Sequence, residues 1–194
     1  TGANDAGVSL ALCGKKVSVA FHTPFTQASD VLIVNTDSRA LKASEAAERV
    51  AALGAEIADA RWLIKKMDST LRGNAGAESQ VLKALSGRRQ VIVAPAYPSA
   101  GRITRYGRCL VNGVPVNETE FASDPKTPVP SAAIADLFTG VSAKSVTVKM
   151  LTAELARGTE WLIVDAHTDE EMDAIIDAAL ACSQTPLLVG SAGL

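Results

Sequence analysis

The stretch VIVAPAYP, residues 91–98, opens with four apolar residues in a row and then stops at a proline. An uninterrupted apolar run of this length is typical of a strand that is covered on both faces, as in a parallel sheet. The same pattern recurs along the chain, and most of the recurrences are continuously apolar rather than alternating. The predicted strands are residues 17–21, 31–35, 62–65, 91–94, 145–148, 161–164 and 187–189.

Segments between several of these strands carry alanine, glutamate, leucine and isoleucine at helical spacing. Thr168 and Glu171 fit a capping box at the start of one such segment. The repeated alternation of strand and helix predicts an α/β fold of three layers, with a mostly parallel, doubly wound sheet between helices. The predicted helices are residues 43–59, 74–86, 150–157 and 168–183.

Residues 95–130 break this alternation, because they are rich in glycine, proline and threonine. Within them, Asn112-Gly113 separates two short apolar runs at 108–111 and 114–116. An Asn-Gly pair between two such runs is a strong hairpin signal. We therefore expect a β-hairpin excursion that passes over the edge or the active face of the sheet.

Composition narrows the classes of function. The chain has 194 residues, 47% of them apolar and 21% charged, which is enough for a packed core. The formal net charge of −2 argues against a surface that coats nucleic acid, although it allows a local basic pocket. No apolar run approaches the roughly 18 residues that a membrane span needs, and no signal-peptide pattern opens the chain. We therefore expect neither nucleic acid nor membrane as a partner.

The cysteines and histidines argue against disulfides and zinc. Cys13, Cys109 and Cys182 are odd in number and far apart, so we interpret them as reduced thiols of a cytoplasmic protein. Only His22 and His167 are available to join them as ligands. We predict no metal ligands in the chain itself.

Polar residues follow three of the predicted strands. In open parallel sheets, ligands bind beyond the carboxyl ends of the strands. If the three strands are neighbours, the loops that follow them share one edge and form one site. The loops are residues 36–39, 66–72 and 95–99.

Basic side chains from these loops favour an anionic ligand. Arg39, Lys66 and Arg72 would converge there with the free N–H groups of the helix that starts near Asn74. A guanidinium fork binds a carboxylate or phosphate through parallel hydrogen bonds, and a helix N-terminus adds partial positive charge. Basic groups together with groups that recognise hydroxyls suit a small polyhydroxylated acid. The groups that would recognise hydroxyls are Asp37, Asp68, Ser69 and Thr70.

A plainer interpretation fits the same residues. Asp, Ser and Thr cap helices well, and charges at strand ends often form surface ion pairs. Lys65 is expected in solvent, because it alternates with Lys66 along the strand. Residues 119–125, TEFASDP, are expected to form a solvated loop.

Two glycine-containing segments have different interpretations. Residues 7–16 have six residues between their glycines and lack a hydroxyl residue after the lysine, so we expect a helix rather than a phosphate-binding loop. Residues 190–193, Gly-Ser-Ala-Gly, follow a predicted strand and suit a phosphate contact made by the backbone.

Taken together, six blocks of sequence resemble the four-carbon acid sugar kinases, a family that includes the threonate, erythronate and 3-oxo-tetronate kinases. The resemblance runs from the first residue to the last, and the ten-residue central block KKMDSTLRGN is its most specific part. The blocks are residues 1–5 (TGAND), 35–39 (NTDSR), 65–74, 94–98 (APAYP), 119–125 and 190–194 (GSAGL).

The resemblance implies a division into domains. Residues 1–186 would form the acid-sugar-binding domain, without the strand and the pair of aspartates that precede TGAND in the family. Residues 187–194 would begin a truncated C-terminal nucleotide-binding domain. We therefore expect the chain by itself to be inactive as a kinase, whatever the whole protein does.

The resemblance also implies roles for individual residues. ATP would be the phosphoryl donor, Mg²⁺ would arrive with it, and Ser191 would contact it. Asp68 is the candidate for the group that accepts the hydroxyl proton, with the absent upstream aspartates as the alternative. The implied contacts to the sugar acid are Asp5, Arg39, Lys66, Met67, Asp68, Ser69 and Arg72.

The predicted function is ATP-dependent phosphorylation of a hydroxyl on a small sugar acid, in a protein that could form a homo-oligomer. Phosphoryl transfer needs in-line positioning and neutralised charge more than covalent help from the protein. The alternative is a non-catalytic module that senses small organic acids through the same pocket. A dehydrogenase or lyase is disfavoured, because no dinucleotide fingerprint is present.

Overall fold

The structure is a computed structural model that describes residues 2–21, 29–57 and 60–194, excluding the side chains of residues 2–5, 55 and 56. Contacts divide the chain into two units, Thr1–Asp37 and Ser38–Leu194, and each is described by itself. None of the described helices is long and apolar enough to cross a membrane.

The first unit is a helix on a pair of parallel strands. α1 (Gly2–Leu12) precedes β1 (Val17–Ala20) and β2 (Val31–Val34), and Val17 pairs with Val31. Gly7 of α1 is buried against the strands, since a Cβ added there would lie 3.3 Å from Val19 Cγ2. The segment is thus helical, as the lack of a proper phosphate-loop spacing predicts.

The second unit contains a five-stranded sheet in which every pairing is parallel. The strand order is β3-β10-β4-β9-β8, so the last strand of the chain lies between two early ones. Residues 187–190, which we predict to begin a nucleotide-binding domain, thus form an inner strand of this sheet; the boundary at residue 187 stays a prediction. The strands are β3 (Leu63–Lys66), β4 (Val91–Ala94), β8 (Lys144–Thr147), β9 (Trp161–Asp165) and β10 (Leu187–Gly190).

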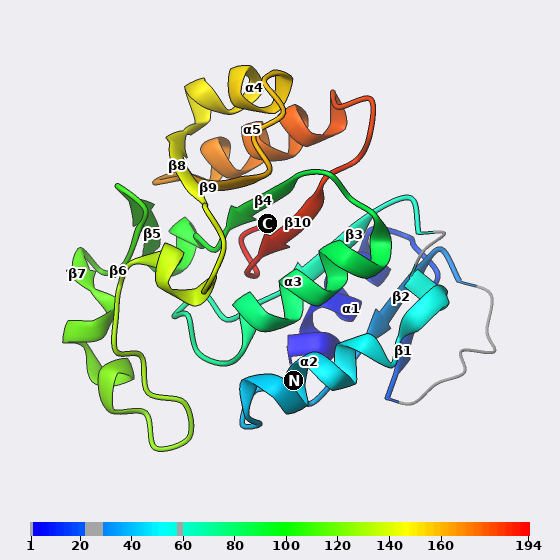
Figure 1. Cartoon of the computed structure of the whole chain (residues 1–194), viewed down its shortest axis with the longest axis horizontal. Coiled ribbons are helices and arrows are strands. Elements are labelled where there is room, and N and C mark those ends of the chain that lie inside the picture. Colours follow the sequence, from blue (N-terminus) through cyan, green and yellow to red (C-terminus); the bar gives the residue numbers. More distant parts are fainter. Residues whose placement is uncertain (1, 22–28, 58–59) are drawn as a thin grey trace. The chain divides into compact units, whose positions relative to one another are not determined.

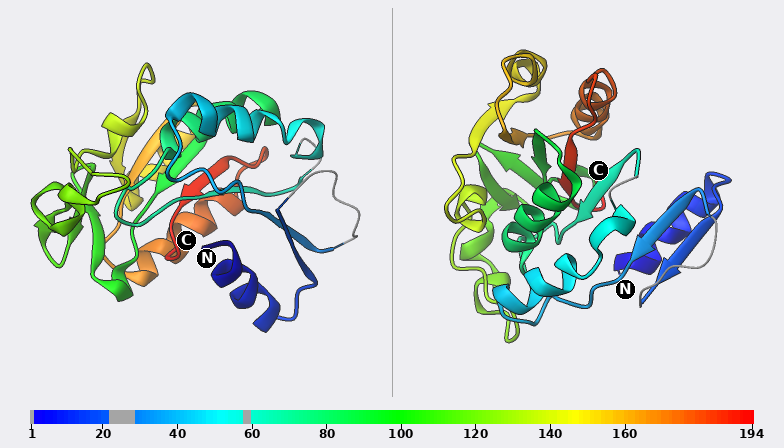
Figure 2. Two further views of the ribbon diagram at one scale, coloured as in Figure 1. Left: turned by 90° about the horizontal axis from the view of Figure 1, so that it is seen from below. Right: turned by 45° about the vertical axis from the view of Figure 1, so that its right-hand side comes forward.

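Helices cover both faces of this sheet, which confirms the α/β fold of three layers (Figure 1). α2 (Ala43–Ala51) packs on α3 (Ala75–Ser86) on one face. α4 (Val148–Ala156) and α5 (Asp169–Leu180) lie together on the other face, as Figure 2 also shows.

Two predicted helices differ in detail. The predicted helix over 43–59 is too long, because α2 ends at Ala51 and a separate 3-10 turn, η1, covers Gly54–Ile57. At the start of α5, Thr168 Oγ1 accepts the Glu171 N–H at 3.2 Å, as predicted. The Glu171 carboxylate accepts the N–H of His167 at 2.6 Å, so it reaches one residue beyond the expected cap.

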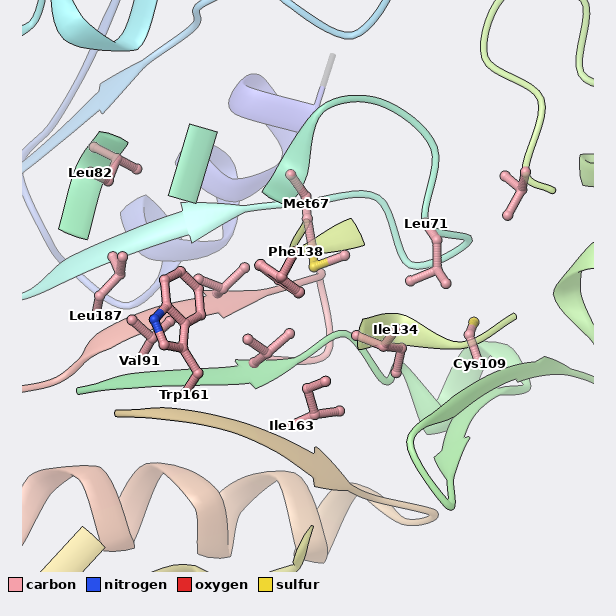
Figure 3. Close-up of a cluster of buried hydrophobic side chains, with 14 of the residues drawn as sticks. Met67, Leu71, Leu82, Val91, Cys109, Ile134, Phe138, Trp161, Ile163 and Leu187 are labelled. Carbon is pink, nitrogen blue, oxygen red and sulfur yellow. The ribbon is translucent and has the colours of Figure 1, made fainter. Parts of the chain in front are cut away.

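The strands explain how the layers are held together. Alternate residues of β4 point to opposite faces: Val91 and Val93 join one buried cluster, and Ile92 and Ala94 join the other. The first cluster is shown in Figure 3, where Phe138 and Trp161 pack with ring centroids 5.2 Å apart. Burial of each large apolar side chain of this kind contributes about 1.5–3 kcal/mol.

A three-stranded antiparallel sheet forms the predicted excursion. It consists of β5 (Arg102–Arg105), β6 (Arg108–Val111) and β7 (Val114–Pro115). Asn112 and Gly113 connect β6 to β7 with φ angles of 49° and 84°, which fits the expected tight hairpin turn.

A second tight turn, which the sequence analysis missed, connects β5 to β6. Tyr106 and Gly107 have φ angles of 52° and 68°. The Asp165 carboxylate accepts their backbone N–H groups at 2.7 and 2.8 Å. The end of β9 therefore holds the hairpin against the main sheet.

Candidate functional site

The candidate site lies beyond the carboxyl ends of β3, β10 and β4, which are adjacent in the sheet. The loops after β3 and β4 therefore share one edge, with the turn after β10 between them. β2 belongs to the other unit, so its expected place beside them is not described. Ser38 and Arg39, however, belong to the same unit as β3.

Backbone hydrogen bonds, both to β10 and within the loop, fix the shape of the loop after β3. The Met67 N–H donates to Gly190 O at 2.7 Å, and the Leu71 N–H donates to Asp68 O at 3.0 Å. Gly73 has a φ of 93°, a conformation that favours glycine. A Cβ at Gly73 would lie 3.4 Å from Arg39 Cγ, which is an ordinary contact, so Arg39 packs beside this loop.

Asp68 is the centre of a charged network. Its Oδ2 accepts hydrogen bonds from Arg72 Nε at 2.6 Å and from Thr70 Oγ1 at 2.7 Å. Its Oδ1 lies 3.6 Å from Arg39 Nη2. Burial alone would raise the pKa of Asp68, but the hydrogen bonds from Arg72 and Thr70 and the nearby arginine charges hold it below its usual value. Asp68 is therefore an ionised carboxylate at neutral pH.

Arg72 is held on a second side by the segment 119–127. Its Nη1 donates to Asp124 Oδ2 at 3.0 Å, and its guanidinium lies 5.0 Å from the centre of the Phe121 ring. The hydrogen bond to Asp68 raises the pKa of Arg72, burial opposes this, and the bond to Asp124 adds to it. Two donors of Arg72, at Nε and Nη1, are thus committed to protein carboxylates.

The segment 119–125 is not the solvated loop that we expect from its sequence. Residues Glu120–Ser123 form a short 3-10 turn, and Thr119 Oγ1 accepts the N–H of Phe121. Asp124 Oδ1 accepts the N–H groups of Thr127 and Lys126 at 2.9 and 3.0 Å. The Thr127 N–H, then Arg72, then the Lys126 N–H lower the pKa of Asp124 to about 2. The expectation was wrong because the partner of this segment is 52 residues away in the sequence.

Lys65 is not in solvent, contrary to the expectation. Lys65 Nζ lies 2.7 Å from Glu78 Oε2, and their side chains are only 16% and 4% exposed. Lys65 is therefore not in solvent, because its face of β3 is covered by α3. Glu78 also accepts a hydrogen bond from the Ser38 hydroxyl. The Lys66 ammonium, on the other face of the strand, donates to Met67 O at 3.0 Å.

Met67, Asp5 and Ser69 are the remaining predicted contacts to the sugar acid. The Met67 side chain is 4% exposed and belongs to the core cluster of Figure 3, so only its backbone faces the loop. Asp5 lies in α1, and its side chain is outside the described part of the structure. Ser69 is next to Asp68, and its carbonyl accepts the thiol of Cys109 at 3.3 Å.

The turn after β10 is packed tightly against the loop after β4. Ser191 Oγ donates to Ala96 O at 3.0 Å and accepts the Gly193 N–H at 3.3 Å, and Ser191 is 4% exposed. A Cβ at Gly193 would lie 2.8 Å from Tyr97 Cα and would overlap the Ala96 carbonyl oxygen. The Ser191 hydroxyl is therefore engaged within the protein.

A cleft of about 270 Å³ lies beside Arg39. Arg39 is the only predicted substrate contact among its lining residues, and its walls are largely apolar side chains such as Leu41, Pro128 and Leu137. At its rim Asn74 Nδ2 donates to the carbonyls of Ser38 and Leu41, both at 2.9 Å. A hydroxylated acid fits the polar corner at Asp68 and Ser69 better than these walls.

Residues 1–194 match the family described as the sugar-binding N-terminal domain. The chain belongs to this family. The match covers all six blocks that resemble the four-carbon acid sugar kinases, so the resemblance is confirmed.

Two relatives of this sugar-binding domain are named as kinases of four-carbon sugar acids. D-threonate kinase of Salmonella typhimurium is 44% identical over 100% of the chain and 50% of its own length. D-erythronate kinase of Heliobacterium modesticaldum is 35% identical over 92% of the chain and 46% of its own length. The chain thus spans about half the length of these relatives.

A crystal structure also resembles this sugar-binding domain. It is a domain of unknown function from Bordetella bronchiseptica, a domain-swapped dimer with bound citrate. It matches with a TM-score of 0.87 and 32% identity, over 100% of the chain and 52% of its own chain.

Proposed function

We propose that this sugar-binding domain holds the substrate of an ATP-dependent kinase that phosphorylates a hydroxyl of a four-carbon sugar acid. The observation that carries the proposal is the half-exposed Arg39 beside the ionised Asp68, on a loop fixed at the ligand-binding edge of the sheet. The names of the Salmonella and Heliobacterium relatives supply D-threonate and D-erythronate as the first acids to test.

Arg39 binds the carboxylate of the acid in this proposal. Its side chain is 54% exposed, and the ion pair that it makes with Asp68 is 3.6 Å long, so its fork remains open to a ligand. Arg72 has a different role, because Asp68 and Asp124 already take its Nε and Nη1 donors. Arg72 holds Asp68 in place rather than binding the acid directly.

Hydroxyl groups of the acid would be recognised by the remaining residues of the loop. Ser69 and Asp68 offer a hydroxyl and a carboxylate, and Asp5 stays a contact predicted from the resemblance alone. Lys66 would add positive charge, and Met67 would contribute its backbone. A carboxylate with several hydroxyls meets donors and acceptors in this set.

In the transfer itself, the attacking hydroxyl oxygen of the acid bonds to the γ-phosphorus of ATP. The bond between that phosphorus and the β,γ-bridging oxygen breaks, and ADP leaves with the electron pair. We propose that the hydroxyl proton passes to Asp68 Oδ1, the oxygen that lies 3.6 Å from Arg39 Nη2. A carboxylate with a lowered pKa is a weak base, which suffices for a loose transition state.

The nucleotide would approach from the turn after β10. Mg²⁺ would arrive with it and neutralise phosphate charge. Since the Ser191 hydroxyl is bonded to Ala96 O, we propose that this turn contributes backbone contacts and that the rest of the nucleotide site lies outside these 194 residues.

A sensor of small organic acids is the second candidate. The hydrogen bond of the Ser191 hydroxyl to Ala96 O favours a sensor, because this hydroxyl is then not available to ATP. The two functions differ in turnover, not in acid binding.

Phosphoryl transfer is measured with the natural polypeptide in which these 194 residues occur. The polypeptide is incubated with ATP, Mg²⁺ and D-threonate, D-erythronate or the neutral erythritol, and ADP release is followed. We expect ADP release with at least one acid and none with erythritol. A sample that binds an acid but releases no ADP with any of them would instead identify the sensor.

Assembly and location are further proposals. The Bordetella relative is a domain-swapped dimer, which supports a homo-oligomer for the whole protein, to be measured by sedimentation. A cytoplasmic location stays a prediction from the cysteines.

A further inference from the structure

Arg102 begins the hairpin that follows the loop after β4. It is the first residue of β5, and its backbone is fixed to Tyr97: the Tyr97 N–H donates to Arg102 O at 2.7 Å, and the Arg102 N–H donates to Tyr97 O at 3.1 Å. Tyr97 in turn packs against Gly193. Arg102 is therefore anchored to the loop that lies against the proposed nucleotide-contacting turn.

The strand pleat turns Arg102 toward the charged network. Alternate residues of a strand share a face, so Arg102 and Thr104 lie on the same side of β5. Thr104 is paired with Cys109, whose thiol donates to Ser69 O at 3.3 Å. Burial and then Asp68 raise the pKa of this thiol to about 12, and Arg102 opposes them, which agrees with the face that the strand gives Arg102.

The donors of Arg102 are mostly unused. Its Nε is buried and has no hydrogen bond, and its Nη1 makes one long bond of 3.4 Å to Ala100 O. None of the ion pairs found among residues 2–21, 29–57 and 60–194 includes Arg102.

Arg88 shows how this chain treats an arginine with a structural role. Its guanidinium donates to the carbonyls of Thr185, Ala60 and Arg61 at 2.7, 2.6 and 3.1 Å. A half-buried guanidinium without such partners is costly unless a ligand completes it.

Charge balance indicates what kind of ligand that is. The carboxylates of Asp68 and Asp124 balance Arg39 and Arg72, and Glu78 balances Lys65. A sugar acid and a phosphoryl group both bring negative charge to this edge. Arg102 supplies positive charge that no carboxylate of the described residues neutralises within 4.0 Å.

We propose that Arg102 binds the phosphoryl oxygens of the phosphorylated sugar acid, on the side of the site that faces the turn after β10. The proposal rests on the kinase function proposed above and adds to it a second anion subsite, separate from the carboxylate subsite at Arg39. An Arg fork suits a phosphate ester, because its N–H groups match pairs of phosphate oxygens.

The test is calorimetric titration of the 194-residue chain with two ligands: D-threonate, and D-threonate phosphorylated on its terminal hydroxyl. Wild type is compared with Arg102→Gln and with Arg105→Gln, a control that removes the same charge from the opposite face of the same strand. We expect Arg102→Gln to weaken the phosphorylated acid about tenfold or more and the free acid less than about twofold. Arg105→Gln should change neither.

Arg102→Lys keeps the charge and should recover part of the affinity for the phosphorylated acid, and it replaces Arg102→Gln if that variant fails to fold. Equal weakening of both ligands would overturn the proposal in favour of a carboxylate contact at Arg102. Unchanged binding of the phosphorylated acid would also overturn it. If wild type binds neither acid, the sugar-acid function itself fails, an outcome that the wild-type titrations alone distinguish.

Discussion

At the scale of single residues, identical side chains differ in role because of the atoms around them. Arg39 and Arg72 both reach Asp68, but only Arg72 is also held by Asp124 and by the face of Phe121. An arginine with open donors is suited to a ligand, and one with committed donors is suited to holding its neighbours.

Substitution of the two arginines should therefore separate binding from stability. Arg39→Ala should weaken acid binding about tenfold to 100-fold and leave the free energy of unfolding nearly unchanged. Arg72→Ala should lower the free energy of unfolding by about 2 kcal/mol, because it leaves Asp68 and Asp124 without their shared partner. Urea unfolding and calorimetric titration of both variants measure the two effects, and equal loss of stability in both would contradict the assignment.

Asp124 should act on ligand binding through Arg72. Asp124→Asn removes the charge that faces Arg72 Nη1, so Arg72 and then Asp68 become less fixed. We expect weaker binding of the sugar acid, with partial recovery in Asp124→Glu. The matched control is Asp136→Asn, since Asp136 lines the cleft beside Arg39 but makes none of the ion pairs found in the described residues. A loss of the same size in the control would show that general charge, rather than Arg72, is responsible.

At the scale of elements, close packing fixes where α3 begins. A Cβ added to Gly76, in the first turn of α3, would overlap the carbonyl oxygen of Leu137. The helix therefore meets the segment Ile134–Leu137 through a residue that has no side chain.

Gly76→Ala should destabilise the chain by about 3 kcal/mol, because backbone atoms on both sides must move. Gly87→Ala, at the other end of α3, is the control: its φ of 62° strains alanine, but nothing lies within 4 Å of the added Cβ. It should cost about 1 kcal/mol. Urea unfolding of both variants would refute the packing argument if Gly87→Ala were the more destabilised.

α4 contains a buried carboxylate that makes stability depend on pH. Glu154 is 1% exposed and is bonded to Lys144, Thr159 and Arg157. Hydrogen bonds from Lys144 and Thr159, against the effect of burial and with help from Arg157, lower the pKa of Glu154 from 4.5 to about 2.

A pKa that is lower in the folded state gives stability that is present above the unfolded pKa and is lost as the pH falls through the folded pKa. The contribution of Glu154 should thus be complete above about pH 4.5 and should disappear toward pH 2. Unfolding by urea at pH 7 and pH 3 should show a smaller acid-induced loss in Glu154→Gln than in wild type. An equal loss in both would contradict this role.

At the scale of the whole molecule, the sequence predicts what local pattern controls. Continuous apolar runs such as 91–94 identify the strands, and Asn112-Gly113 identifies its hairpin, because these signals depend on neighbouring residues alone. The Tyr106-Gly107 turn gave no such signal, since it is held by Asp165, 58 residues or more away.

The candidate site divides in the same way. Two loops of the site are predictable, because their polar residues follow predicted strands. One loop contains Arg39, and the other contains Asp68, Ser69 and Arg72. Two ion pairs, Lys65 with Glu78 and Arg72 with Asp124, could not be predicted from the sequence. Each depends on which segments meet in space. Arg102 could not be predicted either, because a charged residue at the start of a hairpin strand is not specific to a ligand site.

We propose above that Arg39 makes this chain selective for an acid. Its most direct test is calorimetric titration of the 194-residue chain with D-threonate and with erythritol, in wild type and in Arg39→Ala. We predict that wild type binds D-threonate at least about tenfold more tightly than erythritol and that Arg39→Ala abolishes this preference. Equal binding of the two compounds by wild type, or an undiminished preference in Arg39→Ala, would contradict the account.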